Sequence, residues 1–212
     1  MQNEIKSLKL TDCDYYLKNG PLTQPFLPTD FVLKKVESDY NQKVKTDKSY
    51  TKIDSLINYI HHVIKSTEDI NFKNKYKFRR TAQEIWESGI CTGCTDWSIL
   101  FATLSRQIGI PTTFLHTAEL DWILKLQKNE KPPIHKGHTF CECFDGKEWK
   151  LVDATFRKIE SNYNVKKLIL SYNISGSNIF IPYFRGLDLG KKQSTREHND
   201  EMDVYCKNIT IF

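Results

Sequence analysis

The N-terminal half of the chain carries apolar residues at helical spacing. Between residues 51 and 66 they stand at positions i, i+3, i+4, i+7 and i+11, which is one face of an amphipathic helix. These residues are Ile53, Leu56, Ile57, Ile60 and Ile64. A similar stripe from Thr95 to Gln107 predicts a second long helix, and residues 81–88 predict a short one that Gly89 ends as a C-cap. Residues 1–50 contain several prolines, so we expect irregular structure with short pieces there.

The C-terminal half has the pattern of strands. Two runs rich in aromatic and β-branched residues flank Asp145-Gly146, so residues 137–155 predict a β-hairpin. Residues 190–203 are polar and predict a surface loop or a short helix. Further strands are predicted at residues 112–116, 167–173, 178–184 and 207–212. Because helices come first and an antiparallel sheet follows, the order predicts an α+β domain.

Length and charge exclude several classes of protein. The 212 residues suit a single domain that spans the whole chain, with residues 1–50 as an N-terminal embellishment and residues 185–212 as a C-terminal extension. The net charge of +5 is not collected in one tract, and the most basic stretch, residues 71–80, has the pattern of a solvated linker or helix end. We therefore expect no nucleic-acid partner. No apolar run approaches the roughly 18 residues of a membrane span, so we expect no membrane association.

The amino terminus bears on the compartment. Its first ten residues, MQNEIKSLKL, lack the basic and apolar regions of a signal peptide. Unless a leader preceded this sequence, we expect a cytoplasmic protein. The six cysteines would then stay reduced, because a reducing compartment disfavours structural disulfides.

Cys94 is the best-placed nucleophile. It follows Gly93 at the start of the second long helix, where free backbone N–H groups and the helix dipole favour an anion. Near an imidazolium, a thiol in this position ionises well below its free pKa of about 8.5. The same N–H groups could hold the oxyanion that forms when a thiolate attacks a carbonyl.

The predicted hairpin supplies a base and its partner. If Asp145-Gly146 is a two-residue turn, His138 lies directly opposite Asp153, within reach of an imidazole–carboxylate hydrogen bond. Cys94, His138 and Asp153 are then the ingredients of a Cys-His-Asp triad.

Two runs of sequence carry a family resemblance, GICTGCTDWSILFATLSRQIGIPTT and GHTFCECFDGKEWKLVDAT. They resemble the core of the transglutaminase-like superfamily over residues of about 80 to 156. That family has a Gly-x-Cys-x-Asp-aromatic helix start, a Gly-Ile-Pro strand start, a histidine-bearing strand and a return strand that ends in Asp-Pro-Thr. The resemblance implies a papain-like fold, in which a cysteine-bearing helix packs on an antiparallel sheet. It also implies that Cys94 is the nucleophile, His138 the general base and Asp153 the residue that orients the imidazole.

The sequence departs from the family pattern outside the triad. Ser98 stands where a small apolar residue is usual, Thr139-Phe140 replaces Ala/Val-Trp, and Ala154 replaces proline. The oxyanion side chain of the family lies upstream of the cysteine, and Gln83 and Trp86 are the candidates here.

Two other uses of the cysteines are open. Cys91 and Cys94, together with Cys141 and Cys143, offer four thiols for zinc, but strand alternation points the last two away from His138, and Cys-x-Cys on a strand is not a zinc knuckle. A redox pair of Cys91 and Cys94 should follow the first strand of a βαβ unit, which the pattern lacks. We therefore expect no metal and no cofactor.

The expected activity is that of a transglutaminase-like cysteine hydrolase or acyltransferase. Such an enzyme, whether protease, amidase or transglutaminase, acts on a peptide or glutamine amide of a protein or peptide substrate through a thioester. The segment Thr117–Lys136 precedes His138 and is expected to border the cleft. The alternative is a catalytically silent protein-interaction module on the same fold. The oligomeric state does not follow from the sequence.

Overall fold

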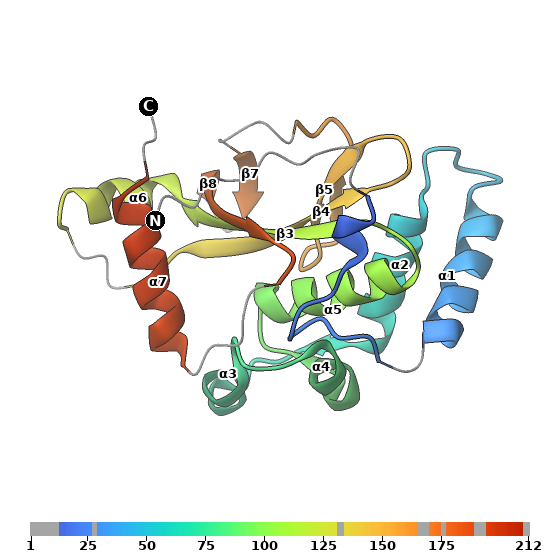
Figure 1. Cartoon of the computed structure of the whole chain (residues 1–212), viewed down its shortest axis with the longest axis horizontal. Coiled ribbons are helices and arrows are strands. Elements are labelled where there is room, and N and C mark those ends of the chain that lie inside the picture. The colour runs from blue at the N-terminus through green and yellow to red at the C-terminus, as the bar shows by residue number, and fades with distance from the viewer. Residues whose placement is uncertain are drawn as a thin grey trace.

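The centre of the protein is an antiparallel sheet. The structure, a computed structural model, describes residues 13–26, 29–130, 134–164, 170–174, 177–188 and 194–209. Within these residues six strands lie in the order β6-β5-β4-β3-β8-β7, and every neighbouring pair is antiparallel (Figure 1). The strands are β3 (Thr112–Glu119), β4 (Gly137–Phe144), β5 (Trp149–Asp153), β6 (Lys158–Glu160), β7 (Leu170–Ile174) and β8 (Ser177–Gly186).

Helices pack on one face of this sheet and against one of its ends (Figure 1). They are α1 (Thr29–Lys43), α2 (Lys52–Val63), α3 (Ile70–Tyr76), α4 (Ala82–Ser88), α5 (Cys94–Gln107), α6 (Leu120–Gln127) and α7 (Thr195–Lys207), with a short 3-10 helix at Tyr15–Leu17. A separate two-stranded parallel sheet joins β1 (Lys65–Ser66) to β2 (Ile90–Cys91). The α+β class predicted from the sequence is confirmed.

Helix α5 is the central helix of the core. Every residue from Thr95 to Arg106 is buried, because α5 packs between the sheet and the other N-terminal helices (Figure 1). The predicted stripe of α2 faces the same core, and its N-terminus is fixed by a capping box between Thr51 and Asp54. The face of the sheet toward α5 contributes side chains such as Phe114 and Cys141. This packing fixes the N-terminal end of α5, where Cys94 lies.

Short signals in the sequence set the start and end of α4. Thr81 and Glu84 form the expected capping box. Gly89 then ends the helix with φ of +65°, a left-handed conformation that favours glycine. These two features turn the chain into β2 and toward the start of α5.

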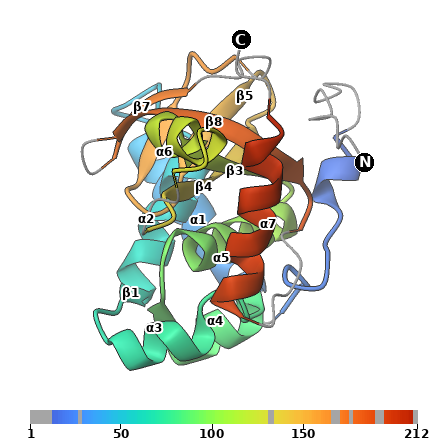
Figure 2. The ribbon, with the colours of Figure 1, turned by 90° about the vertical axis from the view of Figure 1, so that its left-hand side faces the viewer.

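Helices α6 and α7 lie against one end of the sheet. They form a second core with β3 and β8, in which Trp122, Tyr183, Met202 and Cys206 are buried. Figure 2 shows α7 crossing in front of α5 in that view. No helix in the described parts of the chain is both long enough and apolar enough to span a membrane.

Several predictions of secondary structure were wrong. Residues 29–43 form the 15-residue helix α1, although irregular structure was expected; the prolines lie before its start, and Val32 and Val36 are buried one turn apart. Within the segment Thr117–Lys136, residues 120–127 form the helix α6, which the sequence pattern did not predict. For residues 190–203 the expected helix is confirmed from Thr195 on, but α7 has 13 residues and runs to Lys207, which was predicted to begin the last strand.

Other strand predictions lie partly outside the described residues. The strand expected at 178–184 is confirmed as part of β8, and the one at 112–116 as part of β3. Of the predicted strand 167–173, residues 170–173 belong to β7 and residues 167–169 are outside the described residues. Residues 210–212 are also outside them.

Candidate active site

Cys94 is the first residue of α5. Gly93 is the N-cap and provides no capping side chain. The N–H groups of the first turn therefore point out of the N-terminal end of the helix without a side-chain cap. The Cys94 side chain is half-buried. The next turn is tied to the sheet, because the Ser98 hydroxyl donates a 3.1 Å hydrogen bond to the carbonyl of Thr139 on β4. Ser98 therefore links the cysteine helix to the strand that carries His138, which accounts for a polar residue at this position.

His138 and Asp153 form a buried pair. His138 Nε2 lies 3.0 Å from Asp153 Oδ2, and the two side chains are 7% and 0% exposed. The other carboxylate oxygen of Asp153 accepts hydrogen bonds from the N–H groups of Thr155 (2.9 Å) and Phe156 (3.1 Å). The aspartate is therefore fixed on both sides, and it holds the ring of His138 through a single nitrogen.

The predicted hairpin register is wrong by two residues. The turn has four residues instead of two, because the Asp145 carboxylate accepts hydrogen bonds from the N–H groups of Lys147 and Glu148. Phe144 consequently pairs with Trp149, and His138 does not lie directly opposite Asp153. A shift of two keeps both side chains on the same face of the sheet, because side chains alternate with a period of two. His138 reaches Asp153 along the diagonal.

The charged forms of Cys94 and His138 stabilise each other. Burial by itself raises the pKa of the Cys94 thiol, but the charge and hydrogen bond of His138, the backbone N–H of Thr139 and the charge of Lys77 lower it from 9.0 to about 7. Burial likewise opposes protonation of His138, yet Cys94 and Asp153 raise the pKa of its ring from 6.5 to about 10. Since Nε2 of His138 faces Asp153, the ring presents Nδ1 to Cys94. Both shifts favour a thiolate–imidazolium pair.

The cleft beside Cys94 is narrow. It encloses about 70 Å³, where sites for drug-sized ligands enclose several hundred. Helix α7 closes one side of it, and Figure 1 shows this helix standing beside the N-terminal end of α5. The residues that line it come from six segments: Lys77 and Phe78; Cys94 and Thr95; His116; His135 and Gly137 to Thr139; Tyr183; His198, Asn199 and Met202. Four of the six histidines of the chain are among them.

The other thiols differ from Cys94. None of the six cysteines forms a disulfide. Burial raises the pKa of Cys91 and Cys141, and it raises the pKa of Cys143 and Cys206 to about 12. As strand alternation predicted, Cys141 and Cys143 face the core under α5. No group of three or more His, Cys, Asp or Glu side chains in the described residues could hold a metal ion.

The two candidates for the oxyanion side chain lie away from the cleft. Gln83 is exposed on α4 and donates a 2.7 Å hydrogen bond to Glu87. Trp86 packs against Phe26 and Tyr59. The backbone N–H groups at the start of α5 stay next to the Cys94 sulfur.

Sequence reasoning missed several residues around the cleft. The segment Thr117–Lys136 was expected to border it, but of its described residues only His135 lines the cleft. Lys77 and Phe78 lie in the basic stretch that was interpreted as a solvated linker, and α7 lies in a stretch with few apolar residues. The run of aromatic and basic residues directly before the capping box of α4 is the signal that could have indicated Lys77.

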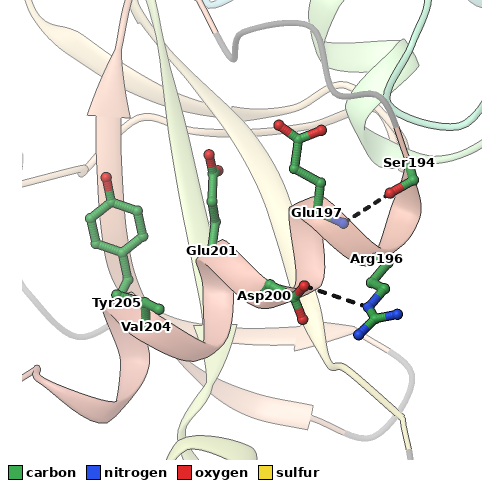
Figure 3. A pocket seen from close by; sticks show the side chains of 7 residues that line it. All are labelled: Ser194, Arg196, Glu197, Asp200, Glu201, Val204 and Tyr205. Atoms are coloured by element: carbon green, nitrogen blue, oxygen red, sulfur yellow. Dashed lines mark hydrogen bonds and ion pairs between the residues drawn. The ribbon is translucent and has the colours of Figure 1, made fainter.

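A second hollow lies on the outer side of α7 (Figure 3). All of its lining residues belong to this helix or its N-cap, where Ser194 accepts a hydrogen bond from the Glu197 N–H. It shares no lining residue with the cleft at Cys94. We therefore place the candidate site at Cys94.

The fold and these residues define a thiol-enzyme architecture. The family model of the transglutaminase-like superfamily matches residues 38–154, which is more than half of the 212 residues and includes Cys94, His138 and Asp153. The chain therefore belongs to the transglutaminase-like superfamily, as the resemblance implied.

A solved structure shares this fold. A candidate cysteine protease from Cytophaga hutchinsonii superposes with a TM-score of 0.50 at 15% sequence identity, over 90% of this chain and 54% of that one. At this identity the likeness shows the fold alone, and the chain spans about half the length of that protein. No curated protein matches the sequence.

Proposed function

We propose that this protein is a thiol-dependent amide hydrolase or acyltransferase, with Cys94 as nucleophile, His138 as general base and acid, and Asp153 as the residue that orients the imidazole. The observation that carries the proposal is the half-buried thiol at a helix N-terminus beside a buried His–Asp pair, with a pKa lowered to about 7. An imidazole and a helix terminus are the two features that activate catalytic cysteines.

The reaction follows from these positions. The Cys94 thiolate attacks the carbonyl carbon of an amide, and the N–H groups at the start of α5 stabilise the oxyanion. The carbon–nitrogen bond then breaks as His138 gives its proton to the departing amine, which leaves a thioester on Cys94. Water or a second amine attacks the thioester, His138 takes up the proton of the attacking group, and the thiolate is regenerated. A peptide bond or a glutamine side chain would both supply such an amide.

We also propose a reducing compartment such as the cytoplasm, in which the six cysteines, none of them in a disulfide, stay reduced. A protein or peptide is the proposed acyl donor, and the chemistry proposed requires no cofactor.

Trapping of the acyl-enzyme tests the proposal. We expect p-nitrophenyl acetate to add one acetyl group to the protein, and peptide mass spectrometry to locate it on Cys94. The adduct should be lost in Cys94→Ala and formed much more slowly in His138→Ala. Adding a labelled primary amine distinguishes acyl transfer from hydrolysis, because an acyltransferase releases the acetylated amine whereas a hydrolase releases acetate.

Cys13 serves as the internal reference, because it is the other half-buried cysteine and the remaining four are buried. Acetylation of Cys13 and Cys94 at equal rates would refute an activated nucleophile at position 94.

One observation favours the second candidate, a protein-interaction module without catalysis. The cleft of about 70 Å³ is too narrow for a folded substrate to enter beside α7. A protein that never acetylates Cys94, even at pH 9, would support this alternative.

A further inference from the structure

A buried ion pair lies directly behind the candidate nucleophile. Arg80 Nη2 lies 2.5 Å from Asp96 Oδ2, and the two side chains are 5% and 0% exposed. Arg80 precedes α4, whereas Asp96 lies in the first turn of α5, two residues after Cys94. The pair therefore joins two segments that are 16 residues apart in the sequence at the base of the cysteine helix.

Both partners also bind the loop that leads to Cys94. Asp96 Oδ2 accepts hydrogen bonds from the N–H (2.8 Å) and the hydroxyl (2.6 Å) of Thr92. Arg80 donates to the carbonyl of Ile90 (2.7 Å) and to the hydroxyl of Ser88 (2.8 Å). Arg80 and Asp96 thus hold the loop Ser88–Gly93 at three points: Ser88, Ile90 and Thr92.

This arrangement sets where the thiol and its N–H groups point. The backbone from Ile90 to Gly93 contains the two-residue strand β2, and the side-chain bonds to Arg80 and Asp96 help to fix its path. A displacement of about 1 Å at a reacting group can cost on the order of 100-fold in rate.

The cleft wall at Lys77 and Phe78 lies directly before Arg80 in the chain. Phe78 has φ of +65°, which is rare for a large side chain, and it lines the cleft together with Lys77. A residue in this conformation persists only when its neighbours hold it there. Arg80, two residues further on, is the buried and multiply bonded neighbour of Phe78.

We propose that Arg80 and Asp96 are positioning residues, which fix the Ser88–Gly93 loop and the Lys77–Phe78 wall so that the Cys94 sulfur faces His138. This inference rests on the proposed function of Cys94. It goes beyond the helix-cap role that the sequence position of Asp96 would suggest, because Asp96 bonds Thr92 and Arg80, which both precede α5 in the chain.

The test uses the pH dependence of Cys94 alkylation by iodoacetamide in Asp96→Asn, with the wild-type protein beside it. We expect the alkylation rate of Cys94 at pH 6 to fall by tenfold or more and the midpoint of its pH profile to rise. Thr92→Val removes one hydroxyl and keeps the ion pair, so it should fold even if Asp96→Asn does not, and we expect a smaller fall of about threefold to tenfold.

The matched control is Glu142→Gln. Glu142 and Arg185 form another buried ion pair, with a 2.7 Å contact and exposures of 0% and 6%, on the opposite face of the sheet from Cys141 and Cys143. This control should lower the melting temperature as Asp96→Asn does, yet change the Cys94 alkylation rate less than twofold.

The outcomes separate the two proposals. If the wild-type midpoint is low and both Asp96→Asn and Thr92→Val keep it despite a lower melting temperature, the ion pair is structural only and the positioning role is refuted. If Cys94 of the wild-type protein titrates like an ordinary free thiol, the proposed function and the positioning role both fail.

Discussion

The replacement His138→Ala tests the charge pair at the candidate site most directly. In the wild-type protein the pKa of Cys94 is about 7, so at pH 6 about one tenth of the thiol is ionised. Without His138, burial leaves the pKa at or above 9.0, and about one thousandth is ionised. The thiolate fraction therefore falls about 100-fold.

Nucleophilicity offsets part of this loss. A thiolate of lower pKa is less reactive, with a Brønsted slope of about 0.4 to 0.5, which over two pH units amounts to about eightfold. The net alkylation rate of Cys94 at pH 6 is therefore expected to fall by about tenfold in His138→Ala. At pH 10 both proteins carry mostly thiolate, so the variant should react as fast as the wild type or faster. His138 lines the cleft, so its removal also widens the access to Cys94, and the ratio of the two rates at pH 10 measures that effect separately.

The assay is a time course of iodoacetamide labelling read by peptide mass spectrometry, with Cys13 as reference within each sample. His62→Ala is the control, because His62 is exposed on α2 and does not line the cleft. Equal rates for wild type and His138→Ala at pH 6 would refute the thiolate–imidazolium pair. A wild-type rate that rises only above pH 8 would refute it as well.

Three further predictions concern the site and the core. Asp153→Asn should lower the pKa of His138 and raise the alkylation midpoint of Cys94, because the carboxylate stabilises the imidazolium; an unchanged midpoint would contradict that role. Phe101→Ala should lower the free energy of unfolding by about 3–5 kcal/mol in urea denaturation, since this side chain is fully buried under the sheet; a loss below about 1 kcal/mol would contradict the packing. Arg185→Met should cost about 3–5 kcal/mol at pH 7, because Glu142 stays buried without its cation. Burial already raises the pKa of Glu142 above that of the unfolded chain. Protonation of Glu142 at pH 5 should therefore relieve part of the stability that Arg185→Met loses at pH 7. Equal losses of stability at the two pH values would contradict a buried, unpaired carboxylate.

Local signals predicted the elements that carry the candidate residues. The end of α4 at Gly89 depends on capping, which involves residues a few positions apart, and α5 follows from the apolar stripe between Thr95 and Gln107. The α1 helix was missed because its buried stripe is weak, with mostly polar residues around Val32 and Val36. Helix α7 is also polar, and it is held by Met202 and Cys206, whose partners lie on β3, β8 and α6.

The candidate triad shows the limit of pattern reasoning about register. Strand alternation correctly put His138 and Asp153 on one face of the sheet. Side chains alternate with a period of two, so a register error of two residues leaves each side chain on the same face. The turn length was wrong, because a side chain, the Asp145 carboxylate, stabilised a longer turn. The pair still meets, since diagonal neighbours on a sheet are within reach of an imidazole ring.

The sequence by itself determined which cysteine begins a helix, which histidine and aspartate share a strand face, and to which family the chain belongs. Only the tertiary structure decided what surrounds them: the Arg80–Asp96 pair behind the nucleophile, the Lys77–Phe78 wall and the helix α7 that narrows the cleft. Caps and alternation act between residues a few positions apart and can be read along the chain. An ion pair across 16 residues or the packing of α7 depends on long-range burial, which exists only once the sheet and its helices have assembled.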